Sequence, residues 1–287
     1  MSSVASTPGE MDVDAAIALA RQRGVDRLEA QRLLAHLLGK DRTWLLAHGE
    51  ATLATGVTLA FEQGLSRRQD GDPIAYIIGT QEFHGLSLEV DPRVLVPRPD
   101  TEVLVDWGLQ LLQGEFGALH EPRVADLGTG SGAIAIAIAA AVARRHTRAR
   151  VWATDVSEEA LTVARGNARR HAPSIRFAQG SWWSPLKGLR FDLVVSNPPY
   201  IAGGDVHLPA LRSEPHGALT PGPTGLEALD DIISGASSHL VPGGWLLLEH
   251  GFDQATAVQR SLASHGFRQV SSRTDLAGHQ RCTGGHL

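Results

Sequence analysis

The N-terminal part of the chain carries apolar residues at the three- and four-residue spacing that is typical of helices. Leucines recur through residues 28–38, Gly39 follows them as a helix stop, and Asp26 precedes them in the position of a capping residue. Residues 1–10 are small and polar, and we expect them to be disordered. The pattern therefore predicts a small helical domain within residues 1–70.

A break and two short apolar runs follow this helical segment. The Gly-Asp-Pro sequence at residues 71–73 interrupts the helical spacing. Residues 75–78 and 86–90 are short apolar runs beside glycines, as expected of two strands. We therefore predict a β-hairpin linker over residues 71–95.

From residue 96 to residue 287, strand-like and helix-like patterns alternate. The expected strands cover residues 123–127, 151–154, 175–178, 191–196 and 245–249, and the expected helices cover residues 101–112, 133–144, 157–171 and 226–240. This alternation predicts an α/β fold with a doubly wound, mostly parallel sheet. In such a sheet, ligands bind beyond the carboxyl ends of the strands, where the strand order reverses.

Three glycines follow the first of these strands, in the loop Gly128-Thr129-Gly130-Ser131-Gly132. Because glycine lacks a Cβ, a ligand can approach the backbone, and the amides at the start of the next helix favour an anionic or polar group. A dinucleotide-binding loop or a tight turn without a ligand would also explain this segment alone. Asp155 ends the next strand, at the spacing of an acid that accepts hydrogen bonds from a ribose diol.

The tetrad Asn197-Pro198-Pro199-Tyr200 directly follows the strand 191–196 and is the most specific motif of the chain. Paired prolines force an extended path on the backbone and offer carbonyl oxygens without N–H groups. Asn197 Oδ1 and the Pro198 carbonyl could each accept one N–H of a substrate amine, and Tyr200 could stack on a flat amide or base. The alternative is a rigid turn that Asn197 caps.

Two such acceptors suit methyl transfer to a planar nitrogen, whose lone pair is delocalised. They would aim the lone pair at an electrophilic methyl group and stabilise the positive charge that grows on nitrogen. Together with the glycine loop, the tetrad predicts an S-adenosylmethionine-dependent methyltransferase that acts on an amide-type nitrogen.

Composition narrows the possible binding partners, compartments and cofactors of the protein. The net charge of −5 does not favour a general nucleic-acid binder, which is normally basic. The single cysteine excludes an internal disulfide and suits a reducing cytoplasm. The start shows no signal-peptide pattern, and the longest apolar stretch is shorter than the roughly 20 residues that cross a bilayer. The 13 histidines are scattered without ligand spacing, so no metal is expected.

The motifs resemble those of the bacterial release factor glutamine methyltransferase family, also called HemK, within the amino-methyltransferases that act on planar nitrogens. Further matching segments cover nearly the whole chain, at residues 73–79, 82–85, 94–102, 214–215, 243–251 and 275–281. The resemblance implies a Rossmann-like class I methyltransferase domain with S-adenosyl-L-methionine as its cofactor. It also implies that the helical domain docks the release factor, and that the N5 nitrogen of the glutamine in a Gly-Gly-Gln motif is methylated.

The same resemblance assigns roles to residues. Those matching the family's cofactor contacts are Gly128, Thr129, Gly130, Ser131, Gly132, Asp155, Trp182 and Asn197. Those matching its substrate contacts are Asn197, Pro198, Pro199 and Tyr200, and the expected catalytic residues among them are Asn197, Pro198 and Tyr200. Thr101 and Glu102 are candidates for closing over the methionine end of the cofactor.

Some alternatives remain open in the sequence. Ser181 replaces the acid that the family often has, and Trp183 replaces its usual Phe, so either Trp182 or Trp183 could face the adenine, with Trp182 favoured by its alignment. Related enzymes methylate a ribosomal protein glutamine or the N6 nitrogen of nucleic-acid adenine. Pro-Asp-Thr-Glu at residues 99–102 argues against the first, and the negative charge argues against the second. We expect a cytoplasmic enzyme that binds release factors and neither membranes nor nucleic acid directly.

Overall fold

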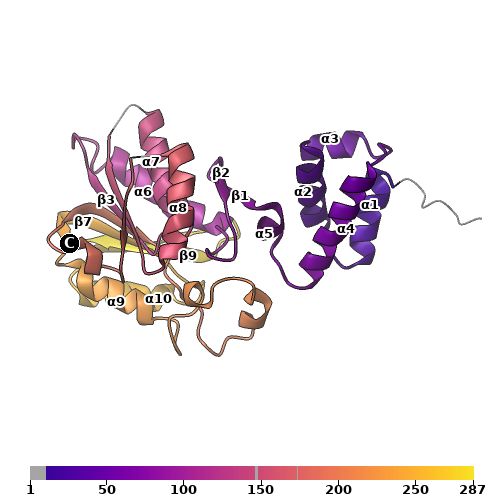
Figure 1. The fold of residues 1–287 in the computed structure, drawn as a ribbon. Coiled ribbons are helices and arrows are strands. Elements are labelled where there is room, and N and C mark those ends of the chain that lie inside the picture. Colours follow the sequence, from indigo (N-terminus) through magenta and orange to yellow (C-terminus); the bar gives the residue numbers. More distant parts are fainter. Residues whose placement is uncertain (1–10, 146–147, 173) are drawn as a thin grey trace, which may run out of the picture. The chain divides into compact units, whose positions relative to one another are not determined.

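The computed structural model describes residues 11–145, 148–172 and 174–287. It consists of two compact units, of which the first ends at Gly79 and the second begins at Thr80 (Figure 1). The expected disorder of residues 1–10 concerns a segment outside the described residues. Among the described helices, none is both long and apolar enough to span a membrane.

The first unit is helical, as its leucine spacing predicts. Its helices are α1 (Val13–Gln22), α2 (Arg27–Leu38), α3 (Arg42–Ala47), α4 (Thr55–Gln69) and α5 (Ile74–Ile78). Asp26 caps α2 by accepting hydrogen bonds from two backbone N–H groups, and Gly39 ends α2 in the left-handed conformation. The core of this unit contains Leu34 and Leu65, whose side chains are fully buried.

The strand expected over residues 75–78 is wrong, because this segment forms helix α5. Pro73 precedes the helix with a φ of −57°, and Gly79 ends it with a φ of 83°. Ile74 packs into the core of the helical unit. This packing outweighs the β-branched composition of the segment. The hairpin that does form consists of β1 (Thr80–Phe83) and β2 (Leu86–Glu89), within the second unit.

The second unit contains a seven-stranded sheet with the order β5-β4-β3-β6-β7-β9-β8. Its strands are β3 (Arg123–Leu127), β4 (Arg150–Asp155), β5 (Arg176–Gln179), β6 (Phe191–Ser196), β7 (Leu240–Glu249), β8 (Arg268–Thr274) and β9 (Gln280–His286). The first five strands in this order run parallel, and β9 and β8 are antiparallel to their neighbours. The predicted doubly wound, mostly parallel sheet is therefore confirmed.

Helices cover both faces of this sheet (Figure 1). They are α6 (Glu102–Gln113), α7 (Ala133–Arg144), α8 (Glu158–His171), α9 (Glu227–Ala236) and α10 (Ala255–Ser264), with a short 3₁₀ turn, η1 (Pro99–Thr101), before α6. Buried residues of α6, α7 and α8 belong to one apolar cluster, and those of α9 and α10 belong to another. Neighbouring strand residues alternate between the two clusters, as Val194 and Val195 do on β6.

The C-terminal part of the unit differs most from expectation. Helix α9 ends at Ala236, well before residue 240, and β7 begins at Leu240 with an irregularity in its pairing that accommodates the Pro-Gly-Gly sequence. On β9, Cys282 lies opposite Glu249 of β7, and its side chain is fully buried. Burial raises the pKa of the Cys282 thiol well above its ordinary value.

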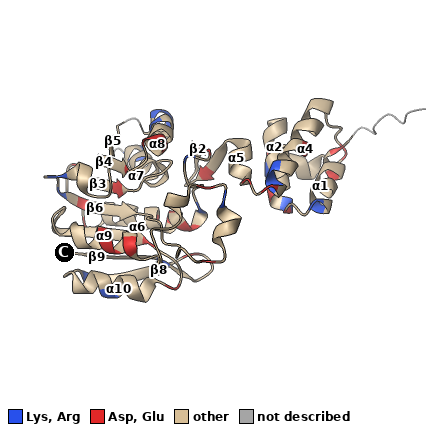
Figure 2. Cartoon of the chain, turned by 60° about the horizontal axis from the view of Figure 1, so that its bottom comes forward, with Lys and Arg blue, Asp and Glu red and all other residues tan. Residues whose placement is uncertain are grey.

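Basic and acidic residues are interspersed over the elements of this unit (Figure 2).

Candidate active site

The three sequence motifs come together at one edge of the sheet. Leu127 at the end of β3 lies level with Thr154 of β4 and with Ser196 of β6. The strand order reverses between β3 and β6, since β4 and β5 extend to one side and β7 to the other. The glycine loop, Asp155 and the tetrad therefore all follow strand ends at the switch point, where ligands bind in this class of sheet.

The glycine loop makes a tight turn that is held by backbone hydrogen bonds. The Thr129 N–H donates to the Thr154 carbonyl over 2.8 Å. Gly130 and Gly132 have φ values of 55° and 86°, which disfavour residues with a Cβ. A Cβ on Gly132 would lie 2.8 Å from Ile136 Cδ1, whereas one on Gly130 would meet nothing within 4 Å. Gly132 is thus needed for packing, and Gly130 leaves one side of the loop open.

Asp126 and Asn167 hold this loop through side-chain hydrogen bonds, and neither was identified as a site residue from the sequence. Asp126 Oδ2 accepts hydrogen bonds from Thr129 Oγ1 over 2.6 Å and from the Ala135 N–H over 3.2 Å. Burial raises the pKa of Asp126 to about 7. Asn167 Nδ2 donates to the Ser131 carbonyl over 3.0 Å. The only sequence signal for Asn167 is that asparagine is a poor residue for a helix interior.

Asp155 ends β4 and is directed back toward the loop. Its Oδ2 accepts from the Gly130 N–H and its Oδ1 from the Ser157 N–H, each over 2.9 Å. Burial raises the pKa of this carboxyl above its ordinary value, and the backbone hydrogen bonds oppose that shift. The side chain is only partly buried. It is therefore accessible beside the open side of Gly130.

The two tryptophans have different surroundings. Trp183 is buried, stacks on His239 and donates from Nε1 to the Ile232 carbonyl over 3.0 Å. Trp182 is half-buried, and its Cζ3 would lie 3.2 Å from a Cβ on Gly128. Trp183 therefore belongs to the core, and Trp182 is the ring that lies against the glycine loop.

The tetrad leaves the sheet directly after β6. Asn197 Nδ2 donates to Thr101 Oγ1 over 3.2 Å, and the Tyr200 hydroxyl donates to Glu249 Oε1 over 3.4 Å. The Tyr200 carbonyl accepts from Gln254 Nε2 over 3.0 Å, which fixes the end of the loop. Within the described residues, Asn197 Oδ1 and the Pro198 carbonyl accept no hydrogen bond. Two acceptors are thus available to a substrate N–H group.

The segment before α6 is anchored on both sides. Glu214 forms an ion pair with Arg98 and accepts from the Val96 N–H over 3.0 Å, and its side chain is almost fully buried. Glu102 Oε1 accepts from the His84 N–H over 2.9 Å, so its carboxylate holds the β1–β2 turn. Thr101 is buried against the tetrad. Of the two candidates in this segment, Thr101 is therefore the one in contact with the motifs.

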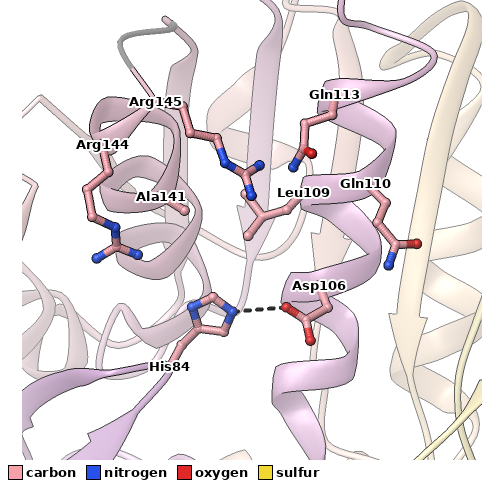
Figure 3. A pocket seen from close by; sticks show the side chains of 8 residues that line it. All are labelled: His84, Asp106, Leu109, Gln110, Gln113, Ala141, Arg144 and Arg145. Carbon is pink, nitrogen blue, oxygen red and sulfur yellow. Dashed lines mark hydrogen bonds and ion pairs between the residues drawn. The ribbon is translucent and has the colours of Figure 1, made fainter.

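A cavity of about 310 Å³ lies elsewhere, between α6 and α7. His84 pairs with Asp106 over 3.1 Å at one end of it, and Arg144 and Arg145 line the opposite wall (Figure 3). No residue of the glycine loop or the tetrad lines this cavity. The candidate active site is therefore identified by the geometry of the strand ends and their motifs.

Known proteins share both units of this chain. The PrmC N-terminal domain family matches residues 14–79, and the Methyltransferase small domain family matches residues 101–213. The release factor glutamine methyltransferase of Bordetella pertussis is 48% identical over 92% of this chain and 96% of its own length, and that of Burkholderia pseudomallei is 46% identical over 94% and 95%. The hMettl16 catalytic domain, 16% identical, has a TM-score of 0.54 over 81% of this chain and 82% of its own, and thus shares the fold.

Proposed function

This chain belongs to the release factor glutamine methyltransferase family, and we propose that it methylates the N5 nitrogen of the glutamine in the Gly-Gly-Gln motif of peptide chain release factors. It is an S-adenosyl-L-methionine-dependent enzyme. The proposal is supported best by two acceptors at the switch point of the sheet, Asn197 Oδ1 and the Pro198 carbonyl, which have no hydrogen-bond partner among the described residues.

The residues at the strand ends fit this cofactor. Gly130 leaves the loop open on the side that Asp155 borders, and a carboxylate there is suited to a ribose diol. The ring of Trp182 against Gly128 offers an apolar surface to a flat adenine. When bound, the cofactor supplies a methyl group on a cationic sulfur as the electrophile.

The tetrad would bind and orient the substrate amide. Asn197 Oδ1 and the Pro198 carbonyl would each accept one N–H of the glutamine side chain, so that the nitrogen lone pair faces the methyl group. As positive charge grows on nitrogen, both hydrogen bonds strengthen, which lowers the barrier. Tyr200 would pack against the planar amide group, with its hydroxyl anchored by Glu249.

The helical unit would supply affinity for the release factor. Its residues 14–79 match the PrmC N-terminal domain, whereas the three motifs all lie beyond residue 127. A separate docking unit would let the enzyme recognise a folded protein while the active site handles one side chain. We place this reaction in the cytoplasm, where release factors act in translation and where the single, buried Cys282 stays reduced.

Mass spectrometry of a purified release factor, incubated with this protein and deuterated S-adenosyl-L-methionine, tests the proposal. We expect one labelled methyl group on the peptide that contains the Gly-Gly-Gln motif, placed on the glutamine by fragmentation. Asn197→Ala, with its cofactor affinity measured alongside, serves as the control that should give little label. Label on a ribosomal protein or on nucleic-acid adenine, with none on the release factor, would overturn the proposal.

A further inference from the structure

Glu249 is a buried acid that the proposed mechanism uses only to anchor the Tyr200 hydroxyl. It ends β7, whose Leu248 pairs with Ser196 of β6, so Glu249 lies level with the first residue of the tetrad. Its exposed fraction is 1%. The three residues before it in the strand are fully buried leucines. An apolar side chain would therefore suit this position better if it served the core alone.

The burial of this carboxyl costs stability. Within the described residues, Oε2 has no hydrogen-bond partner. Burial raises the pKa of Glu249 to about 7, with the Thr101 and Tyr200 hydroxyls and Arg281 opposing the shift and Asp100 adding to it. An acid that is incompletely paired in a protein interior is destabilising, and such groups are concentrated at functional sites.

The contacts of Glu249 link the two ends of the tetrad. Tyr200 donates its hydroxyl proton to Glu249 Oε1 directly. Burial raises the pKa of Tyr200, so this hydroxyl stays protonated as a donor. At the other end, the Thr101 hydroxyl lies beside the Glu249 carboxyl and favours its charged form, while its oxygen accepts from Asn197 Nδ2 over 3.2 Å.

These contacts determine which end of the Asn197 carboxamide faces Thr101. A hydroxyl has one proton, and above about pH 7 the ionised carboxylate of Glu249 is an acceptor only, so the Thr101 hydroxyl turns its proton toward it. The Thr101 oxygen is then left as an acceptor, so the group of Asn197 that faces it must be the NH₂. The carbonyl oxygen Oδ1 is thereby turned away from Thr101, and it is this oxygen that has no partner among the described residues.

We propose that Glu249 is a positioning residue for the methyl transfer, which sets the orientation of the Asn197 carboxamide through Thr101 and holds the Tyr200 ring directly. This role rests on the proposed function. Without the acceptor, the Thr101 proton is free to turn toward Asn197, and the carboxamide can then present its NH₂ to the substrate. That orientation repels the substrate N–H groups.

Matched substitutions separate this role from a structural one. Glu249→Leu removes the acceptor but keeps an apolar side chain of similar size, and we expect kcat to fall about 10- to 100-fold. Cofactor Kd and the KM for the release factor should change by less than about threefold, because the proposed sources of these affinities are the glycine loop with Asp155 and the helical unit. Glu249→Gln keeps an oxygen that accepts both hydroxyls, so it should recover most of the lost kcat. Asp192→Asn, at the opposite end of β6, is the acid-to-amide control and should leave kcat unchanged.

The order of action is tested by combining substitutions. Thr101→Val should lower kcat by a similar factor, and Thr101→Ser should restore it. Because both residues act in one chain of hydrogen bonds, the Glu249→Leu, Thr101→Val double variant should be no slower than the slower single variant. The proposal would be overturned if the losses of kcat of the two single variants multiplied in the double variant. An unchanged kcat for Glu249→Leu, or a Glu249→Gln variant as slow as Glu249→Leu, would also overturn it.

A readout that needs no substrate keeps the two proposals separate. In ¹⁵N NMR spectra, the Asn197 side-chain NH₂ should give a shifted, slowly exchanging pair of signals in the wild type and in Glu249→Gln. Both Glu249→Leu and Thr101→Val should lose that shift. If the wild type failed to methylate release factors, the proposed function would fail, and these spectra alone would decide whether Glu249 orients Asn197. Unchanged signals in Glu249→Leu would refute the positioning role even in an active enzyme.

Discussion

Asp155 Oδ2 accepts a hydrogen bond from the Gly130 N–H over 2.9 Å, which ties the end of β4 to the middle of the glycine loop. Its other oxygen accepts from the Ser157 N–H at the start of α8. The carboxylate therefore fixes the loop that it borders, and it also remains partly accessible to a ligand. Two functions of one side chain, loop support and ligand contact, are thus expected to be lost together when it is removed.

Replacing Asp155 tests this pairing. Asp155→Ala should weaken S-adenosyl-L-methionine binding, because a charge-assisted hydrogen bond is worth on the order of 1.5–3 kcal/mol, or about 10- to 150-fold in Kd. Asp155→Asn keeps one acceptor oxygen and should lose less affinity for the cofactor. Calorimetric titration gives the affinities, and circular dichroism checks that the fold is kept. Equal affinities for the wild type and Asp155→Ala would refute the ligand role.

The two tryptophans should respond in opposite ways to substitution. Trp182→Leu should weaken cofactor binding with little loss of stability, because the ring is half-buried against Gly128. Trp183→Leu should destabilise the protein by about 2–4 kcal/mol, since a buried ring and its hydrogen bond to Ile232 are lost. Urea denaturation and calorimetric titration of both variants measure these effects. A Trp183→Leu variant that kept its stability but lost cofactor affinity would reverse the assignment.

Asn197 is expected to act in the methyl transfer itself. Asn197→Ala removes the oxygen that would accept the substrate N–H, and turnover should fall about 10²- to 10³-fold. Asn197→Asp retains an acceptor but loses the donor to Thr101, so some activity should survive. The expected order of kcat is wild type, then Asp, then Ala, with cofactor affinity measured in parallel. Full activity of Asn197→Ala at saturating cofactor and release factor would disprove the tetrad mechanism.

The helical unit is expected to affect substrate affinity rather than chemistry. A fragment of residues 80–287 keeps both apolar clusters of the sheet and every motif. It should bind cofactor like the full chain and methylate the release factor poorly at low substrate concentration. Initial rates over a range of release factor concentrations separate KM from kcat. A fragment with the KM of the full chain would contradict the docking role.

The buried acid at the end of β7 should make stability depend on pH. Because the pKa of Glu249 is raised from 4.5 to about 7, the folded protein keeps a proton that the unfolded chain has lost in this range. The free energy of unfolding that this group contributes therefore falls as pH rises from about 4.5 to 7. Glu249→Gln lacks this titration and should gain stability relative to the wild type between pH 5 and pH 8. Urea denaturation of both proteins at each pH measures the difference in the free energy of unfolding. A difference that stays the same at every pH would contradict the prediction.

Elements with a strong local pattern were predictable from the sequence. Helix α7 and strand β6 have the predicted bounds, because an alanine- and isoleucine-rich run and a buried strand before a proline pair leave few alternatives. Helix α5 was mistaken for a strand because five residues carry too little periodicity to reveal a helix. Its conformation is decided by the capping Gly79 and by packing of Ile74 against the other helices.

The site was predictable to the extent that its residues lie in contiguous motifs. The glycine loop, Asp155 and the tetrad each follow a strand, so the rule for parallel sheets brings them to one edge. Asn167 and Glu249 were missed because their contacts join segments far apart in the chain, and each is one polar residue within an ordinary helix or strand. Alignment favoured Trp182 over Trp183, and only the contacts of the side chains show that Trp183 lies in the core and Trp182 against the glycine loop.

The burial of Cys282 turns the only thiol of the chain into a natural reporter of local opening. Alkylating reagents and oxidants attack the thiolate, and a buried thiol with a raised pKa offers almost none of it to solvent. Modification must therefore wait until the apolar cluster that covers Cys282, next to Glu249, opens. The rate at which a thiol reagent labels the native protein thus measures how often this part of the sheet opens locally, without any engineered probe.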